Sequence, residues 1–70
     1  MAKGANDIAQ AFRSLCLAYQ AGVEGNNDDL KAKVTEAKDF GTQAVAASSS
    51  FSSLQTKINE IGDTLLNQVK

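Results

Sequence analysis

Hydrophobic residues recur every three or four positions in two parts of the chain, and a polar segment separates these parts. Side chains at this spacing lie on one face of an α-helix. Asn6 or Asp7 can cap the start of the first helix through its side-chain oxygen. The sequence therefore predicts a first helix over 7–21, whose contacts with the rest of a helical hairpin come from Ile8, Phe12, Leu15 and Tyr19.

The polar segment 22–28 contains Gly22, Gly25 and two consecutive asparagines. Glycine reaches positive φ without steric cost and often ends a helix, and asparagine is favoured in turns. We expect the first helix to end near Ala21 and the chain to turn over 22–28.

A second and longer stripe begins at Leu30 and runs almost to the end of the chain. Asp28 or Asp29 can cap its helix, which we predict over 29–70. From Ala37 onward the steps alternate between three and four without exception, a spacing typical of a coiled coil. This stripe, which we call the seam, consists of Ala37, Phe40, Ala44, Ala47, Phe51, Leu54, Ile58, Ile61 and Leu65.

Serines crowd the middle of the predicted long helix, at 48–50 and 52–53. Serine competes with the helix by bonding to nearby backbone groups. The alternative interpretation is a bend or loop at 48–53 that splits the long helix in two.

The predicted fold is an all-α helical hairpin in one domain, with a short first helix and a long second helix. At 1.5 Å per residue these helices reach roughly 22 Å and roughly 60 Å, so more than half of the long arm stays uncovered. A soluble monomer does not tolerate an exposed row of large apolar side chains. We therefore predict a homo-oligomer or filament with an assembly interface formed by Phe40, Ala44, Ala47, Phe51, Leu54, Ile58, Ile61 and Leu65.

Composition argues against several other classes of protein. The formal net charge of −1 and the scattered lysines provide no basic patch for nucleic acid. The longest uncharged stretch, 40–56, is too rich in serine, threonine and glutamine to span a membrane. The first residues do not show the pattern of a general secretory signal, so we expect synthesis in the cytoplasm without one.

The chain also lacks the residues of common catalytic and metal sites. With no histidine and one cysteine, it cannot assemble the usual nucleophile–base pairs or zinc sites. Asp28 and Asp29 fit a helix start, and Glu60 and Asp63 have no second acidic pair to complete a metal site. We predict no enzyme activity and no cofactor. Cys16, on the face of Phe12, is interpreted as a small buried hydrophobe.

The predicted plan is a short helix, a turn and a long helix, and the chain ends on a distinctive run of residues. This ending is Glu60-Ile61 followed by Leu65-Leu66-Asn67-Gln68-Val69-Lys70. The plan and the ending resemble the needle subunits of bacterial type III secretion systems and their inner-rod relatives. The family turn usually carries prolines, and this chain has none.

The resemblance implies a structural subunit that stacks helically, with the long helix lining a narrow channel for unfolded proteins and the first helix outside. It also implies export by the secretion apparatus, contacts with other proteins of that apparatus, and an extracellular or cell-surface filament. The competing hypothesis is a small cytoplasmic helical adaptor or secretion chaperone that acts as a dimer or in a hetero-complex.

Overall fold

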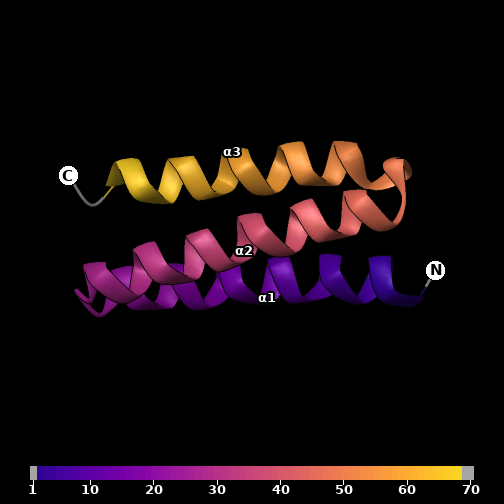
Figure 1. Cartoon of the computed structure of the whole chain (residues 1–70). Helices are drawn as coiled ribbons and strands as arrows, with labels where there is room; N and C mark the ends of the chain where they lie inside the picture. The colour runs from indigo at the N-terminus through magenta and orange to yellow at the C-terminus, as the bar shows by residue number, and fades with distance from the viewer. Residues whose placement is uncertain (1, 69–70) are drawn as a thin grey trace.

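The computed structural model describes residues 2–68, with side chains from 4 to 68. It has three helices, α1 (Ala2–Val23), α2 (Asn27–Ala47) and α3 (Ser52–Gln68), and a 3₁₀ turn, η1 (Ser49–Phe51), precedes α3. Successive helices run in opposite directions and form a rod of 36 × 17 × 12 Å (Figure 1). The prediction of an all-α fold is confirmed, and the described residues contain no strand.

The turn between α1 and α2 follows from a glycine at a left-handed position. Gly25 has φ +80°, its N–H donates to the Gly22 carbonyl at 3.1 Å, and the Asn26 N–H donates to the Ala21 carbonyl at 2.8 Å. This paired arrangement is the Schellman ending of a helix. The Asn26 side chain then caps α2 by accepting from the Asp29 N–H at 3.2 Å. The predicted turn is present, but Asn26 is the cap rather than Asp28 or Asp29.

The first helix is longer than predicted. α1 begins at Ala2, so Asn6 and Asp7 lie inside it and do not cap its start. Alanine and lysine before these residues are strong helix formers, and they extend the helix toward the start of the chain. The prediction of a short first helix over 7–21 is therefore wrong.

The predicted single helix over 29–70, of which 69–70 lie outside the described residues, is also wrong, and the alternative break at 48–53 describes the structure. Ser48 has extended backbone angles, φ −159° and ψ 125°, and ends α2 while its side chain accepts from the Ser50 N–H. Serine is suited both to end α2 and to cap the following turn, because its hydroxyl accepts a hydrogen bond from a backbone N–H that has no carbonyl partner there. The chain reverses here, so α3 packs back along α2 and covers the arm that the hairpin model left exposed.

α1 and α2 pack through small residues. The buried positions of α1 include a series spaced by three and four: Gly4, Asp7, Ala11, Ser14, Ala18 and Ala21. Its counterpart on α2 consists of Leu30, Val34, Ala37, Gly41 and Ala44, all buried. Small side chains on one helix let larger ones from the other pack closely without voids. Ser14 and Glu36 add a hydrogen bond of 2.9 Å across this contact.

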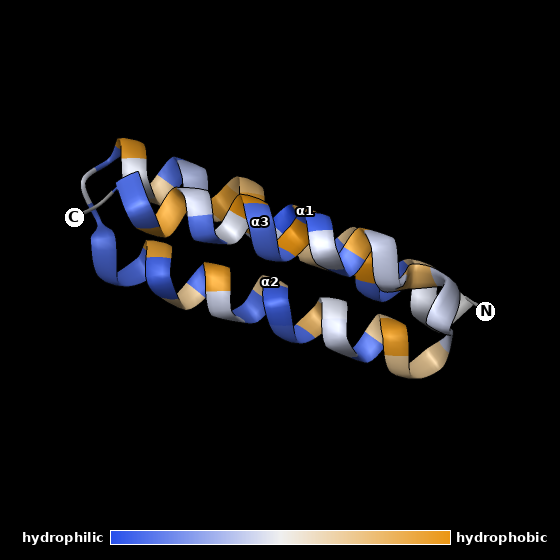
Figure 2. Cartoon of the chain, turned by 90° about the horizontal axis from the view of Figure 1, so that it is seen from above, coloured by the Kyte–Doolittle hydropathy of each residue, from blue (hydrophilic) through white to orange (hydrophobic). Residues whose placement is uncertain are grey.

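α3 fits against both other helices through Ile58, Gly62 and Leu65, its buried residues. A methyl group on Gly62 would lie 2.9 Å from Cγ1 of Val34 in α2 and 4.0 Å from Cδ2 of Leu15 in α1. The three helices therefore meet closely at Gly62. Figure 2 shows the corresponding pattern, with hydrophobic and hydrophilic positions alternating along each helix.

Candidate functional site

The predicted assembly residues are divided between the core and the surface of a single chain. Ala44, Ile58 and Leu65 are buried, Phe40 and Phe51 are partly buried, and Ala47, Leu54 and Ile61 are exposed. Because α3 folds back, burial of Ile58 and Leu65 requires no second copy. The fold leaves no uncovered arm, so its geometry does not require assembly.

The four predicted contact residues of the first helix also differ in burial. Ile8 and Leu15 are buried, Phe12 is partly buried, and Tyr19 is 61% exposed. Cys16 is exposed, which corrects its interpretation as a buried hydrophobe. One residue along a helix turns a side chain by about 100°, so Cys16 points away from the core that Leu15 enters.

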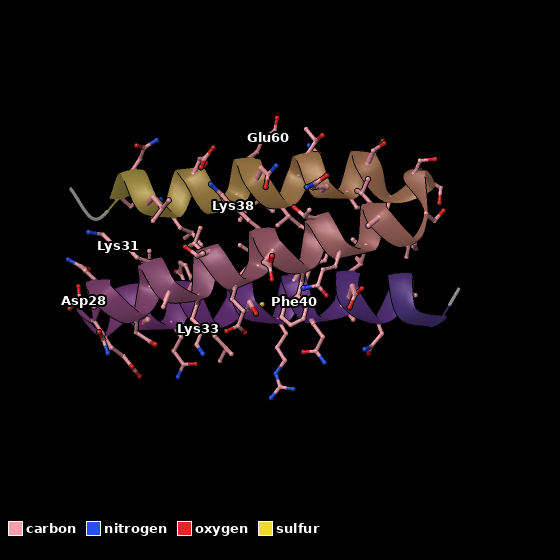
Figure 3. The ribbon with its side chains drawn as sticks, viewed as in Figure 1. Asp28, Lys31, Lys33, Lys38, Phe40 and Glu60 are labelled. Atoms are coloured by element: carbon pink, nitrogen blue, oxygen red, sulfur yellow. The ribbon has the colours of Figure 1, made fainter. Side chains whose placement is uncertain are left out.

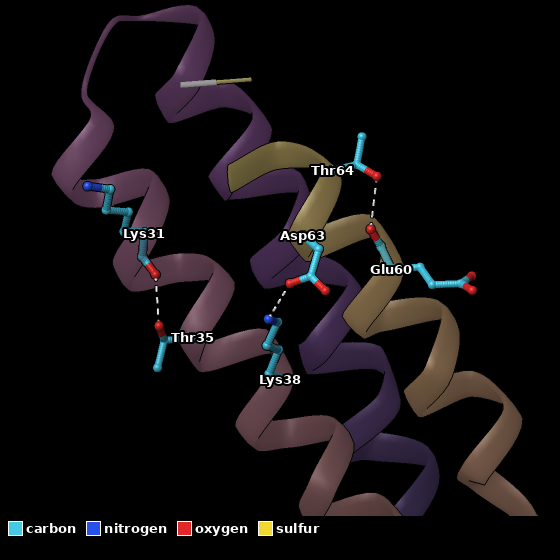
Figure 4. Close-up of polar contacts among 6 residues, drawn as sticks. All are labelled: Lys31, Thr35, Lys38, Glu60, Asp63 and Thr64. Atoms are coloured by element: carbon cyan, nitrogen blue, oxygen red, sulfur yellow. Dashed lines mark hydrogen bonds and ion pairs between the residues drawn. The ribbon is translucent and has the colours of Figure 1, made fainter. Parts of the chain in front are cut away.

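The acidic residues singled out in the sequence lie in surface contacts. Asp63 in α3 accepts a hydrogen bond from Lys38 Nζ in α2 at 2.6 Å (Figure 4). The Glu60 carboxylate lies 3.9 Å from Lys57 Nζ. Asp28 and Asp29 are exposed in the first turn of α2. Within the described part of the chain, no three residues among histidine, cysteine and the acids are grouped to hold a metal ion.

The lysines of α2 point in different directions. Figure 3 shows Lys33 extending past α1, while Lys31 and Lys38 lie on the side of α3. Asp39 and Glu36 are interleaved with them along the helix. The described lysines of α2 therefore form no single basic face.

An open groove lies at the end of the bundle where α1 ends, α2 begins and α3 ends. It has a volume of about 250 Å³, its surface is partly apolar and partly polar, and it is lined by Tyr19, Gly22, Val23, Leu30, Leu65 and Gln68. We call these six residues the end groove. Its floor is fixed by Leu30 and Leu65, which are 2% and 7% exposed, while Val23 on its rim is 71% exposed.

The end groove is uncharged, but the neighbouring turn is acidic. Each of its six lining residues is neutral, whereas Glu24, Asp28 and Asp29 are exposed in the segment between Val23 and Leu30. Tyr19 provides an aromatic ring with a hydroxyl group at the open side. An exposed aromatic residue over a rigid apolar floor is typical of the centre of a protein–protein interface.

Leu54 and Ile61 form a second exposed apolar feature, on α3. They are seven positions apart, so they lie on one side of the helix, and their exposed fractions are 37% and 40%. A further hollow, about 430 Å³, lies at the opposite end of the bundle beside η1 and is lined by Gly4, Ala47, Ser48, Ser50 and Phe51.

Sequence reasoning identified only part of the end groove. Tyr19 and Leu65 are among the predicted contact residues, but in two different contacts. Gly22 and Val23 both fall in the predicted turn, although α1 continues to Val23. Leu30 was identified as the start of the second stripe. The groove depends on how three helix ends meet, and the local patterns contain no direct signal for that meeting.

Comparisons with known proteins found no matching family model, no matching curated protein and no matching solved structure. Within the described residues, no helix is both long enough and apolar enough to cross a membrane.

Proposed function

We propose that this chain is a non-enzymatic adaptor that binds an amphipathic helix of a partner protein in the end groove. The observation that carries the proposal is the exposure of Tyr19 and Val23 above a buried floor of Leu30 and Leu65. Leu30 and Leu65 are already buried in the single chain, so a partner side chain that covers the apolar part of the groove orders few additional side chains of this protein.

The lining and its surroundings define the chemistry of the partner. An uncharged groove accepts the apolar face of a helix, whose large side chains repeat at three and four positions. The exposed acids Glu24, Asp28 and Asp29 beside it favour lysine or arginine at the edges of that face. The proposed ligand is therefore a basic amphipathic helix with at least one large apolar anchor.

Site-specific photocrosslinking in the producing cell tests this proposal. A photoreactive phenylalanine analogue replaces Tyr19 in the full chain, and the matched control carries it at Leu17, which is 37% exposed and lies outside the end groove. We expect one discrete adduct with a different protein at position 19, and its loss when Val23→Asp places a charge on the rim. Equal labelling at both positions, or no adduct at position 19, would refute the adaptor function.

The second candidate is the filament subunit favoured by the sequence. Its support is the seam, which keeps its alternating steps from Ala37 to Leu65 even though α2 and α3 are separate helices. Filament formation through the whole seam requires α3 to leave the bundle. Electron microscopy of the purified chain at high concentration distinguishes the two: long polymers support the filament, and discrete particles at every concentration refute it.

A further inference from the structure

The two connections in this bundle are built differently. Between α1 and α2, Gly25 occupies a left-handed conformation with φ +80°, which residues with a side chain rarely adopt. The second connection, Ser48–Phe51, which we call the hinge, has no residue with positive φ. Ser48 is extended, and by Ser52 the backbone is helical with φ −60° and ψ −37°. The first turn is fixed by its glycine, but the hinge can become helical without strain.

The hinge is held in its bent form by one packed side chain and by hydrogen bonds within the hinge itself. Phe51 packs against the core and lies next to Gly4 of α1. The Ser48 hydroxyl accepts from the Ser50 N–H at 3.4 Å and lies 2.8 Å from the Ser50 hydroxyl, and the Phe51 N–H donates to the Ser48 carbonyl at 3.1 Å. All three serines of the hinge are exposed. A continuous helix would replace the hydrogen bonds of these serines with ordinary backbone bonds between residues four apart.

The seam continues in phase through the hinge. Its steps from Ala44 to Ala47, Phe51, Leu54 and Ile58 are three, four, three and four. The buried positions keep the same phase, because Ala37, Ala44, Ile58 and Leu65 are separated by multiples of seven. Two helices joined by an unrelated loop have no reason to share one phase. The sequence from 27 to 68 therefore fits one straight helix of about 60 Å as well as two helices packed side by side.

The contacts that bind α3 to the rest of the chain do not depend on the hinge. Gly41 would place a methyl group 3.4 Å from Cδ1 of Ile58, Lys38 pairs with Asp63, and Gln55 Nε2 donates to the Thr42 hydroxyl at 2.8 Å. These contacts join surfaces of α2 and α3 that remain the same if α3 comes from a second copy. Exchange of an identical element between protomers conserves its contacts and changes only the hinge.

We propose that the hinge straightens and that two copies of this chain exchange α3, which gives a domain-swapped dimer with a continuous α2–α3 helix in each protomer. The partner is a second copy, and the surface that receives its α3 is the one formed by Val34, Lys38, Gly41 and Leu15. The proposal is independent of the adaptor function, because the end groove is formed from the same residues in both states.

Two hinge variants shift the equilibrium between the bent monomer and the exchanged dimer in opposite directions. Ser49→Pro suits the bent form, because proline is tolerated at the first position of a helical turn and keeps the preceding residue extended, as Ser48 is. Inside a straight helix, proline at position 49 lowers the population of the straight form about a hundredfold in each protomer. Because a dimer contains two such protomers, its association constant falls by roughly 10⁴-fold. Replacing Ser48, Ser49 and Ser50 together by alanine removes the cap and favours the straight helix.

Size-exclusion chromatography with light scattering, after unfolding and refolding at high concentration, measures the dimer fraction. We expect dimer in the wild type, more dimer in the triple alanine variant and monomer alone in Ser49→Pro. Circular dichroism establishes that Ser49→Pro folds. A wild type and triple variant that stay monomeric, or a dimer that persists undiminished in a folded Ser49→Pro protein, would overturn the proposal.

A crosslinking experiment with an unchanged hinge distinguishes exchange from side-by-side association. Lys38→Cys and Asp63→Cys are introduced together with Cys16→Ser, and the isolated dimer is treated with a short bifunctional thiol reagent. Exchange places the two new cysteines of each contact on different chains, so a denaturing gel shows covalent dimers. Links confined to single chains would show that α3 is not exchanged.

Discussion

We expect the substitution of glycine by alanine to change the free energy of unfolding in opposite directions at two positions in the helix interfaces. Gly41 in α2 and Gly62 in α3 are both buried inside helices. Alanine in a helix interior is favoured over glycine by up to about 1 kcal/mol. The two substitutions therefore share this gain, and they differ in what the new methyl group meets.

At Gly41 the methyl group meets atoms at ordinary contact distance. Its ideal position lies 3.4 Å from Cγ of Gln55 and 3.4 Å from Cδ1 of Ile58. We expect Gly41→Ala to stabilise the bundle by about 0.5–1 kcal/mol.

At Gly62 the methyl group lies 2.9 Å from Cγ1 of Val34, a residue that is 1% exposed. Valine in a helix has one strongly preferred rotamer, so its methyl group cannot turn away and α3 must move. Overpacking costs typically about 1–3 kcal/mol. Gly62→Ala should therefore destabilise the bundle by about 1 kcal/mol after the helix gain is included.

Urea unfolding followed by circular dichroism measures both variants. A separation of about 2 kcal/mol corresponds to roughly 10 °C in the melting temperature of a domain of this size. Val34→Ala should cost less stability in the Gly62→Ala background than in the wild type, because there it also removes the crowded atom. Equal stabilisation by both glycine substitutions would show that α3 does not approach α2 closely at Gly62.

Three further predictions are measured by the same unfolding assay. Ala44→Leu should destabilise by about 1–3 kcal/mol because Ala44 is fully buried, while exposed Ala47→Leu should change stability by less than about 0.5 kcal/mol; equal effects would contradict the assigned helix faces. Ile58→Ala should cost about 3 kcal/mol and half-exposed Ile61→Ala less than about 1 kcal/mol, and the reverse order would place α3 in the wrong rotation. Gly25→Ala should cost about 1 kcal/mol through its positive φ, and an unchanged midpoint would mean that the turn has another conformation.

Local signals in the sequence are sufficient to predict the all-α class and the turn between α1 and α2. Gly25 supplies a conformation that other residues avoid, so its place in a polar segment predicts a chain reversal directly. The second reversal has no comparable residue. Ser48 to Ser50 allow both a cap and a continuous helix, and the unbroken seam favoured the continuous helix.

Part of the core of α1 is missing from the prediction for a different reason. The predicted periodicity uses large apolar residues, and it includes Ile8 and Leu15, which are buried, together with Tyr19, which is 61% exposed. α1 instead faces α2 with small residues such as Ala11 and Ala18, both fully buried. A series of small residues at steps of three and four has the same helical period as a series of large ones, and that signal would have identified this face.

The assembly surface could not be predicted because burial depends on the tertiary fold. Leu54 and Ile58 belong to the same seam, yet one is 37% exposed and the other is completely buried. The difference in their exposed fractions is set by the side of α3 that faces α2 and α1 once the three helices pack together. The sequence pattern provides the face of a helix, and the neighbours decide which part of that face meets water.

The order of the helices also affects how fast the chain folds. α1 and α2 are neighbours in sequence, and so are α2 and α3, so their contacts close short loops. Closing a short loop costs less entropy than closing a long one, and helical bundles rich in local contacts fold in microseconds to milliseconds. Only contacts between α1 and α3, such as the approach of Leu15 to Gly62, join distant parts of the chain. We therefore expect rapid folding of the single chain.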